Sequence, residues 1–388
     1  MSKTTAFEEK CINTIRFLAA DAIEKAKSGH PGMPMGAAAA AHTLWVSHLK
    51  HNPVNPRWVD RDRFVLSAGH ASMLLYVLLH LTGYDLSMDD LKAFRQWESR
   101  TPGHPELHCA PGVEVTTGPL GQGLSNAVGM AIAEAHLAAR FNRPDCEVVD
   151  HFTYVLASDG DIMEGVTAES CSLAGHLGLG KLIVLYDDNR VSLAGTTSLS
   201  FTEDVGRRFE AYGWQVLRVQ EGNRPAAINA ALQQARAEES KPSIISVQTV
   251  LGYGAPHKQG TADAHGSPLG RDELDAAKKN LGWPVDPTFF VPEDVSNFYR
   301  EALDRGKARE EQWLQTFERY RRQYPEQAAE FSRVLAGRLP DDWEAALPVY
   351  GEGAADVATR KAGETVMQAL APKIPELMGG SADLNPST

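Results

Sequence analysis

The stretch FTYVLASDGDIMEGVTAESCSLAGHLGLGKLIVLYDDN, residues 152–189, decides the fold of this chain. It opens with an apolar run that predicts a buried strand, Phe152–Ala157, and it closes on a second such run, Lys181–Tyr186. A helix is predicted between the two, from about Val166 to Gly175. A strand, a helix and a strand in this order form a right-handed crossover, so the two strands are expected to be parallel.

Polar residues follow each of these strands. Asp159 and Gly160 come after the first, and the run Asp187, Asp188 and Asn189 comes after the second. Because the carboxyl ends of parallel strands meet at one edge of the sheet, Asp159 and Asn189 are expected to be neighbours. Carboxylate, amide and carbonyl oxygens suit magnesium or calcium, and a glycine before a helix lets a phosphate approach the backbone. The pattern therefore predicts a divalent metal and phosphate site.

A simpler interpretation exists for each half of this site. Asp159 could cap the following helix, and residues 187–189 could form an ordinary turn. Either half alone favours the simpler interpretation. The occurrence of both halves at strand ends across one crossover favours the metal.

The same alternation of strands and helices continues on both sides of this unit. Further strands are predicted at Phe64–Leu66, Trp214–Val219 and Ser243–Val250, with helical patterns between them. This order is typical of the α/β class, with a mostly parallel sheet covered by helices on both faces.

The residue pattern of the sequence changes after residue 283. Residues 1–283 carry the α/β pattern, and residues 284–357 form a proline-containing linker and a charged helical segment. Residues 358–388 look like the start of another α/β unit, with a helix at 358–371 and a first strand and turn in PELMGGSADL, residues 375–384. One helix and one strand cannot bury a core, so we expect that the chain is the front part of a longer polypeptide or that a partner supplies the rest.

The composition argues against several classes of function. The net charge of -12 disfavours a general surface for nucleic acid or acidic membranes. The longest strongly apolar run, Met73–Leu81, is too short to span a bilayer, and no targeting segment is visible. The four cysteines lack the spacing of a zinc site or a disulfide framework, which favours a reducing cytoplasm.

Four of the thirteen histidines lie beside glycine in Gly/Pro-rich loops. These are His30, His70, His104 and His265. A lone histidine is more often a packed or surface residue than a functional one, and we interpret the other nine in that way. The four in loops are predicted to be functional, because loops at the ends of elements carry binding and catalytic groups.

Several motifs together resemble the transketolase family, over nearly the whole chain. They are SGHPGMPMG, SAGHAS, TPGHPE, TGPLGQG, DGDIMEG, YDDNRVS, HKQGTADAHGSPLG, ATRKAGETV and GGSADLNPS, in the family's order. Two departures are visible: Ser158 stands where the family signature has glycine, and Val191 where it has isoleucine. The resemblance implies the thiamine diphosphate-binding fold.

The resemblance also implies a cofactor and the residues that hold it. The cofactor is thiamine diphosphate with Mg²⁺, or with Ca²⁺ or Mn²⁺, and the metal ligands are Asp159, Asn189 and the carbonyl of Val191. The cofactor-binding positions are His70, Gly118, Leu120, Asp159, Gly160, Asn189, His265 and Asp383. Asp187 is expected to orient Asn189 without contacting the metal itself.

Other positions match the family's substrate site. His30, His104 and His265 are implied to be catalytic and to contact the sugar hydroxyls, since neutral imidazoles donate and accept protons near neutral pH. Arg360 and Ser387 match positions that hold the substrate phosphate. Glu164 and Glu169 are either solvated helix residues or part of the family's charged network between active sites.

The implied reaction is the transfer of a two-carbon ketol unit between sugar phosphates. The donor is a ketose phosphate such as xylulose 5-phosphate, and the acceptor is ribose 5-phosphate or erythrose 4-phosphate, as in the pentose phosphate pathway or the Calvin cycle. The family's active site is shared between the two subunits of a homodimer. Residues 284–388 do not contain the family's complete pyrimidine-binding domain, so the chain alone is expected to bind the cofactor weakly and turn over little.

Two other functions stay open. One is a related ketol transferase such as dihydroxyacetone synthase, which shares most of these loops. The other is a non-catalytic fragment that binds the cofactor.

Overall fold

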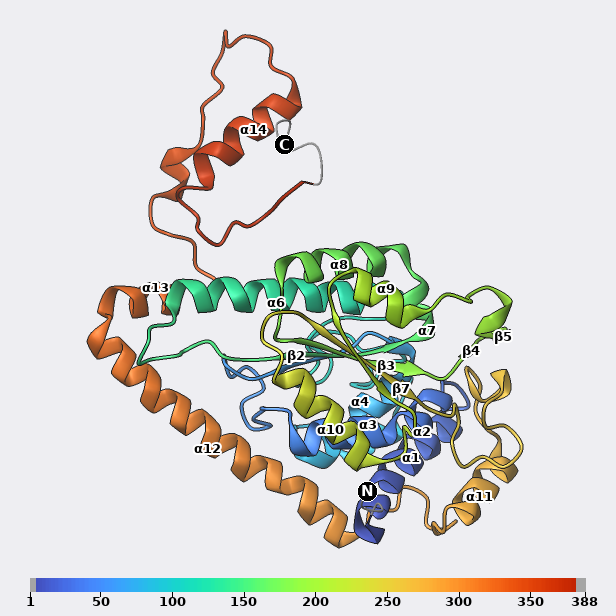
Figure 1. Cartoon of the computed structure of the whole chain (residues 1–388). Helices are drawn as coiled ribbons and strands as arrows, with labels where there is room; N and C mark the ends of the chain where they lie inside the picture. Colours follow the sequence, from blue (N-terminus) through green and yellow to red (C-terminus); the bar gives the residue numbers. More distant parts are fainter. Residues whose placement is uncertain (1–4, 382–388) are drawn as a thin grey trace. The chain divides into compact units, whose positions relative to one another are not determined.

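The computed structural model describes residues 5–381 and contains a five-stranded parallel sheet with the order β1-β2-β3-β7-β6 (Figure 1). The strands are β1 Arg63–Leu66, β2 Thr153–Ser158, β3 Leu182–Asp188, β6 Gln215–Val219 and β7 Ser243–Gln248. The predicted crossover is confirmed, because β2 and β3 are parallel neighbours on either side of α8, Gly165–Leu177.

Helices cover both faces of the sheet, as the sequence predicts. One face packs against α1 Ala6–Ala26, α3 Ala38–Ser47, α4 Ser72–Thr82 and α10 Pro225–Arg236. The other face packs against α6 Gln122–Phe141, α8 and α9 Val205–Ala211 (Figure 1). Alternate strand residues supply the two cores, so Ile183 and Leu185 face one set of helices while Val184 and Tyr186 face the other.

The first unit also contains shorter elements. They are α2 Gly32–Gly36, α5 Met88–Lys92, α7 Asp159–Met163, the hairpin β4 Val191–Ser192 with β5 Gly195–Thr196, and α11 Arg271–Asn280. The register aligns the strand ends at the carboxyl edge of the sheet: Ser158 lies opposite Asp187, and Asp188 lies opposite Gln248.

The structure corrects the ends of two predicted strands. β7 ends at Gln248, two residues before the predicted end at Val250. β3 runs on to Asp188, two residues beyond the predicted end at Tyr186. Asp187 and Asp188 are therefore strand residues and not part of a turn. They continue the strand because Ser158 on one side and Val247 and Gln248 on the other offer backbone partners.

The chain divides into two compact units. The first comprises the residues up to Asn142 together with Glu147–Leu314, and the second comprises Arg143–Cys146 and the residues from Gln315 onward. The charged segment forms α12 Glu293–Gln323 and α13 Pro325–Leu335, and the helix predicted at 358–371 is α14 Thr359–Leu370. Between residues 5 and 381, no helix is both long and apolar enough to cross a membrane.

The strand predicted in PELMGGSADL is wrong for its described part. Residues 375–381 form neither a strand nor a helix, and residues 382–384 lie outside the described part of the chain. A strand requires backbone partners, and no other strand is present among the described residues of the second unit.

Candidate functional site

The turn after β2 is closed by Asp161 and not by Asp159. The Asp161 carboxylate accepts hydrogen bonds from the backbone N–H of Ser158 at 2.9 Å and from the Ser158 hydroxyl at 3.1 Å. This closure begins α7 at Asp159 itself. The interpretation of Asp159 as a helix cap is therefore wrong, and its carboxylate is available for other contacts.

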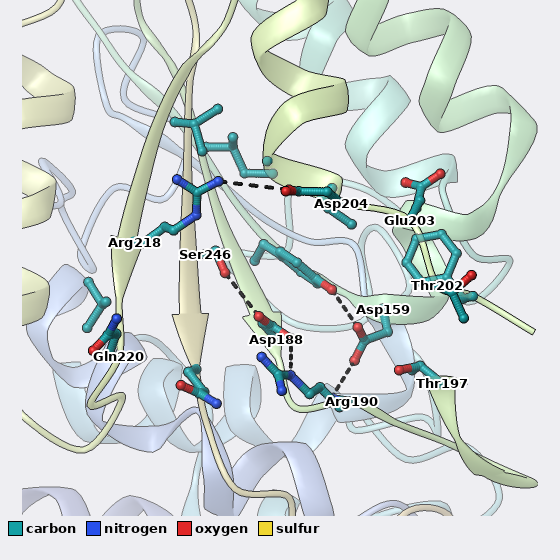
Figure 2. A pocket seen from close by; sticks show the side chains of 18 of the residues that line it. Asp159, Asp188, Arg190, Thr197, Thr202, Glu203, Asp204, Arg218, Gln220 and Ser246 are labelled. Atoms are coloured by element: carbon teal, nitrogen blue, oxygen red, sulfur yellow. Dashed lines mark hydrogen bonds and ion pairs between the residues drawn. The ribbon is translucent and has the colours of Figure 1, made fainter. Parts of the chain in front are cut away.

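Asp159 lies against the end of β3, where the sequence placed it. The Tyr186 hydroxyl donates to its Oδ1 at 2.5 Å, and the backbone N–H of Arg190 donates to its Oδ2 at 3.1 Å (Figure 2). The side chain is buried, with 3% of the residue exposed. Each carboxylate oxygen keeps a lone pair for a further partner.

Asn189 is held in one orientation by its neighbours. Its amide N–H donates to Asp187 Oδ2 at 2.7 Å, and its Oδ1 accepts the backbone N–H of Val191 at 2.9 Å. Asp187 is buried and accepts a second hydrogen bond from the Thr249 hydroxyl. The interpretation of residues 187–189 as an ordinary turn is therefore wrong, since Asp187 and Asp188 belong to β3. The contact with Asp187 fixes which end of the Asn189 amide carries the free lone pair.

Burial raises the pKa values of two carboxylates at this edge of the sheet. Burial raises the pKa of Asp159 to about 6, against the opposing hydrogen bond from Tyr186, and the nearby charge of Asp188 raises it further. Burial also raises the pKa of Asp187 to about 7, opposed by Thr249 and Asn189. The protein alone therefore leaves these carboxylates short of compensating positive charge.

The donor set fits a hard divalent cation. Between residues 5 and 381, no three His, Cys, Asp or Glu side chains converge as a metal centre. What the strand ends offer is one carboxylate, one amide oxygen and nearby backbone carbonyls, which are oxygen ligands of the kind that Mg²⁺ and Ca²⁺ prefer. Such a set is complete only when a bound phosphate or water adds oxygens.

The glycine-rich loop, residues 116–123, packs closely on the neighbouring strand ends. A Cβ on Gly160 would lie 2.9 Å from a methyl carbon of Leu120, and a Cβ on Gly69 would lie 2.7 Å from the backbone nitrogen of Gly118. Gly118 itself has a φ of 150°, in the region that favours glycine. These glycines allow the loops after β1 and β2 to approach the glycine-rich loop.

The four loop histidines form one histidine cluster, His30, His70, His104 and His265. Ring centroids are 5.1 Å apart for His30 and His70, 5.3 Å for His70 and His265, and 6.0 Å for His30 and His265. The ring of His104 lies 6.5 Å from that of His30, and a Cβ on Gly118 would lie 3.4 Å from the His104 ring. The structure thus brings together all four histidines that the sequence singled out.

The histidine cluster is neutral near pH 7. Burial lowers the pKa of His70 to about 3 and that of His30 to about 4, and the neighbouring imidazoles lower both further. Burial also lowers the pKa of His104 and of His265. Neutral imidazoles can each donate one hydrogen bond and accept another.

Buried polar atoms without partners surround this cluster. Among the described residues they include His265 Nδ1, Thr117 Oγ1 and Arg95 Nε. Such atoms are costly unless a bound molecule or water satisfies them, so the cluster fits a polar ligand.

Sequence reasoning missed Arg95. Its Nη1 donates to the Ser28 hydroxyl at 2.8 Å, and its Nη2 lies 3.5 Å from His30 Nδ1. Arg95 adopts a positive φ of 58°, which an arginine rarely adopts. No motif marks it, and only the folded loop brings it to His30.

The remaining predicted positions lie elsewhere or outside the described residues. Arg360 is exposed in the first turn of α14, in the second unit. Asp383 and Ser387 lie outside the described residues. Glu164 and Glu169 are exposed at the start and on the surface of α8.

A cavity of about 510 Å³ is lined in part by Asp159 and Tyr186 (Figure 2). Its walls come from β3, β6, β7 and the segment 197–206. Arg190 and Arg218 line it, and each forms a long ion pair, at 3.6 Å to Asp188 and 3.9 Å to Asp204.

The fold and this sheet edge define the class of α/β proteins that carry a ligand site at the carboxyl ends of a parallel sheet. The profile of the family described as "Transketolase, thiamine diphosphate binding domain" matches residues 7–340. The chain belongs to the transketolase family.

Several relatives show how far this likeness extends. The chain is 58% identical to a transketolase of Nostoc sp. over 99% of its own length and 58% of the relative, and 56% identical to one of Geobacillus stearothermophilus over 98% and 57%. A crystal structure of a Pichia stipitis transketolase in complex with sedoheptulose 7-phosphate is 47% identical, with a TM-score of 0.95 over 99% of this chain and 56% of that one. The chain thus spans less than three-fifths of the length of these relatives.

Proposed function

We propose that this chain binds thiamine diphosphate and a divalent cation, Mg²⁺ or else Ca²⁺ or Mn²⁺, as part of a ketol transferase. The observation that carries the proposal is the meeting of Asp159 with the Asn189 turn, about thirty residues apart in sequence, at the carboxyl ends of β2 and β3. Open α/β sheets bind their ligands at this edge.

The cation would be held by Asp159, Asn189 and the carbonyl of Val191. The oxygen donors of the first two and the raised pKa of the Asp159 carboxyl support this assignment. His70, Gly118, Leu120, Gly160 and His265 would hold the cofactor, and the close packing of their loops supports that role. Asp383 is proposed for the cofactor from the motif alone.

The histidine cluster would recognise the sugar. His30, His104 and His265, neutral near pH 7, would donate to and accept from substrate hydroxyls and move protons between them. Thiamine diphosphate, when bound, supplies the electron sink for cleavage of a carbon–carbon bond. Arg360 and Ser387 would hold the substrate phosphate.

The proposed substrates are sugar phosphates. The donor would be xylulose 5-phosphate and the acceptor ribose 5-phosphate or erythrose 4-phosphate, in the pentose phosphate pathway or the Calvin cycle. The sedoheptulose 7-phosphate complex of the Pichia stipitis relative supports this substrate class.

We further infer the organisation of the functional protein. Residues 1–283 would form the diphosphate- and metal-binding domain, 284–357 a connecting segment, and 358–388 the start of a pyrimidine-binding domain. Turnover would require the remaining length that the relatives have, in a homodimer with shared active sites. A cytoplasmic location agrees with four free cysteines.

Calorimetric titration of thiamine diphosphate in the presence of Mg²⁺ tests the site. Asp159→Ala and Asn189→Ala should each weaken cofactor binding by about tenfold or more, because each removes a proposed metal ligand. Asp204→Ala, which removes a carboxylate from the rim of the neighbouring cavity, should leave the affinity unchanged. Equal affinities of all four proteins would contradict the metal assignment.

A ketol-transfer assay tests the reaction separately. Xylulose 5-phosphate and ribose 5-phosphate should be converted by a protein extended to the length of the relatives, and only slowly by the 388-residue chain. Cofactor binding without transfer in the extended protein would leave the metal assignment standing and overturn the proposed activity.

A further inference from the structure

A second hollow lies away from the proposed cofactor site. It has a volume of about 740 Å³ and is lined by residues from the segment 55–61, by Arg100 and by the loop 107–114. We call it the basic hollow. Among the residues that the structure describes, none of the proposed cofactor, metal or substrate residues lines it.

The charge of the basic hollow is opposite to that of the whole chain. Three guanidinium groups line it, those of Arg57, Arg61 and Arg100, and Glu114 is the one acidic residue that the described part of the chain adds to its lining. Arg61 donates to both oxygens of Glu114, at 2.8 and 2.6 Å, so these two charges cancel. Arg57 has no carboxylate partner among residues 5–381, whereas Arg100 also lies 3.2 Å from Asp85 and 3.6 Å from Asp90, which are outside the lining. The lining itself thus keeps a positive charge in a chain whose net charge is -12.

Both of these arginines have donors to spare. Within residues 5–381, the exposed Arg57 side chain makes no hydrogen bond or ion pair. Arg100 donates through Nη2 to the carbonyl of Asp85 at 2.6 Å and to the Asp85 carboxylate at 3.2 Å, and its Nη1 lies 3.6 Å from the Asp90 carboxylate. A guanidinium has five N–H donors, so each can also bind an anion.

The loop that closes the basic hollow is held in an unusual conformation. His108 has a φ of 80°, a left-handed conformation that non-glycine residues rarely adopt. Gly112 has a φ of 92°, and a Cβ there would lie 2.5 Å from a methyl carbon of Leu79. Strained backbone of this kind persists where packing holds it, and it clusters at ligand sites.

We propose that the basic hollow binds a phosphate group, either as free inorganic phosphate or as the end of a small phosphate ester. Arg57 and Arg100 would bind its oxygens through their N–H forks. The volume leaves room for an ester beyond the phosphate itself. In sequence, the loop 107–114 connects His104 to the glycine-rich loop. A bound anion would therefore stabilise the segment that joins these two parts of the proposed site.

Phosphate binding to the full chain tests this proposal. Inorganic phosphate is titrated calorimetrically into protein that already holds saturating thiamine diphosphate and Mg²⁺. Arg57→Ala should weaken phosphate binding by about tenfold, and Arg57→Lys by less, because lysine keeps the charge and loses the fork. Arg322→Ala, which removes an exposed arginine of α12, should change nothing.

Each outcome decides the matter. If Arg57→Ala and Arg322→Ala weaken binding equally, phosphate acts as a general ionic effect and the proposal is overturned. If His70→Gln weakens it and Arg57→Ala does not, phosphate occupies the histidine cluster and the proposal is again overturned. An unchanged midpoint of thermal unfolding for Arg57→Ala shows that the comparison concerns binding and not folding.

A second titration separates the two sources of the phosphate group. Ribose 5-phosphate that binds more tightly than inorganic phosphate, with a loss in Arg57→Ala, assigns the basic hollow to a phosphate ester. Equal affinities, both lost in Arg57→Ala, assign it to free phosphate.

Discussion

Two side chains that are not proposed as ligands determine how the proposed ligands are presented. Tyr186 donates to Asp159, and Thr249 donates to Asp187, which in turn holds the Asn189 amide. Without these contacts the Asp159 carboxylate and the Asn189 amide could rotate, and ordering them again would cost entropy on binding.

Replacement of Tyr186 by phenylalanine tests this support. The change removes the hydroxyl that donates to Asp159 and keeps the ring in the core. We expect the affinity for thiamine diphosphate with Mg²⁺ to fall by about tenfold in a fluorescence or calorimetric titration. Tyr154→Phe, on β2, removes a hydroxyl that bonds Arg236 instead and should have no effect on this affinity. Equal losses in both variants would count against the role of Tyr186.

The sequence predicted Asp159, Asn189 and the four histidines, because each stands in a loop with a recognisable residue pattern. It did not single out Tyr186 or Arg95. A tyrosine at the end of an apolar strand reads as core, and the proximity of Arg95 to His30 depends on a positive φ that residue type does not reveal. Contacts between segments distant in sequence need the fold before they can be recognised.

A buried histidine makes stability depend on pH. His51 stacks on Tyr84 and is buried, and burial lowers its pKa to about 3. The unfolded chain binds a proton at this position near pH 6.5, whereas the folded chain does not, so stability is lost as the pH falls from 6.5 towards 3.

His51→Gln should remove this contribution to the pH dependence of stability. Between pH 4.5 and 6, we expect the slope of the unfolding free energy against pH to fall by about 1.4 kcal/mol per pH unit, measured by urea denaturation. Tyr84→Phe removes the hydroxyl that lies 3.1 Å from His51 and leaves the imidazole buried, so it should keep the slope. An unchanged slope in His51→Gln would show that the ring is protonated in the folded state.

At the scale of elements, one carboxylate joins three of the loops at the sheet edge. Asp161 is fully buried and accepts from the Ser67 hydroxyl at 2.7 Å, from the backbone N–H of Gly121 at 2.8 Å and from Ser158. These donors belong to the end of β1, the glycine-rich loop and the end of β2. Asp161 therefore fixes the relative positions of the loops that pack around Gly160.

Asp161→Ala should leave these donors unsatisfied. We expect a loss of about 2–4 kcal/mol in the free energy of unfolding, measured by urea denaturation. The matched change is Asp204→Ala, which removes an exposed cap of α9 and should cost about 1 kcal/mol. A smaller loss for Asp161→Ala than for Asp204→Ala would contradict the proposed role.

A buried ion pair joins α11 to α1. Lys278 Nζ lies 2.6 Å from Asp21 Oδ1, with side-chain exposures of 1% and 3%, and the backbone N–H of Phe289 donates to the same carboxylate at 2.8 Å. Lys278→Met should cost about 3–5 kcal/mol, because it strands a buried carboxylate. The double variant with Asp21→Leu should recover most of this loss.

An exposed pair provides the comparison. Lys92 and Asp89 lie 3.3 Å apart on the surface, and Lys92→Met should cost less than about 1 kcal/mol. A double variant as unstable as Lys278→Met alone would show that packing, and not the stranded charge, causes the loss.

The strands that the sequence predicted are each at least half apolar, whereas the elements it missed are not recognisable in this way. The hairpin β4–β5 has two residues in each strand and so shows no periodicity. The end of β3 was missed because Asp187 and Asp188 are poor strand residues, and only their partners on β2 and β7 keep them in the sheet.

At the scale of the whole molecule, the described chain contains both a packed unit and an exposed segment without secondary structure. The first unit holds the sheet and both cores, whereas residues 349–358 of the second unit are exposed and form no helix or strand. Segments of this kind are the preferred sites of proteolysis.

Limited digestion with a glutamyl endopeptidase should therefore cut first after Glu352. Its neighbours are exposed on both sides, so the protease can bind them without unfolding the first unit. Mass spectrometry of the earliest fragments provides the measurement. A first cut after Glu134, which is buried on α6, would instead indicate that the first unit opens more readily than its packing suggests.

The two parts of the proposed site differ in how much of the chain must close before each can form. Asp159 and Arg190 are 31 residues apart and belong to one crossover. The histidine cluster joins the first loop of the chain, at His30, to the loop after β7, at His265. Because short loops close sooner than long ones, the carboxylate side of the site assembles early in folding, and the chain becomes competent for its ligand only when its most distant segments have met.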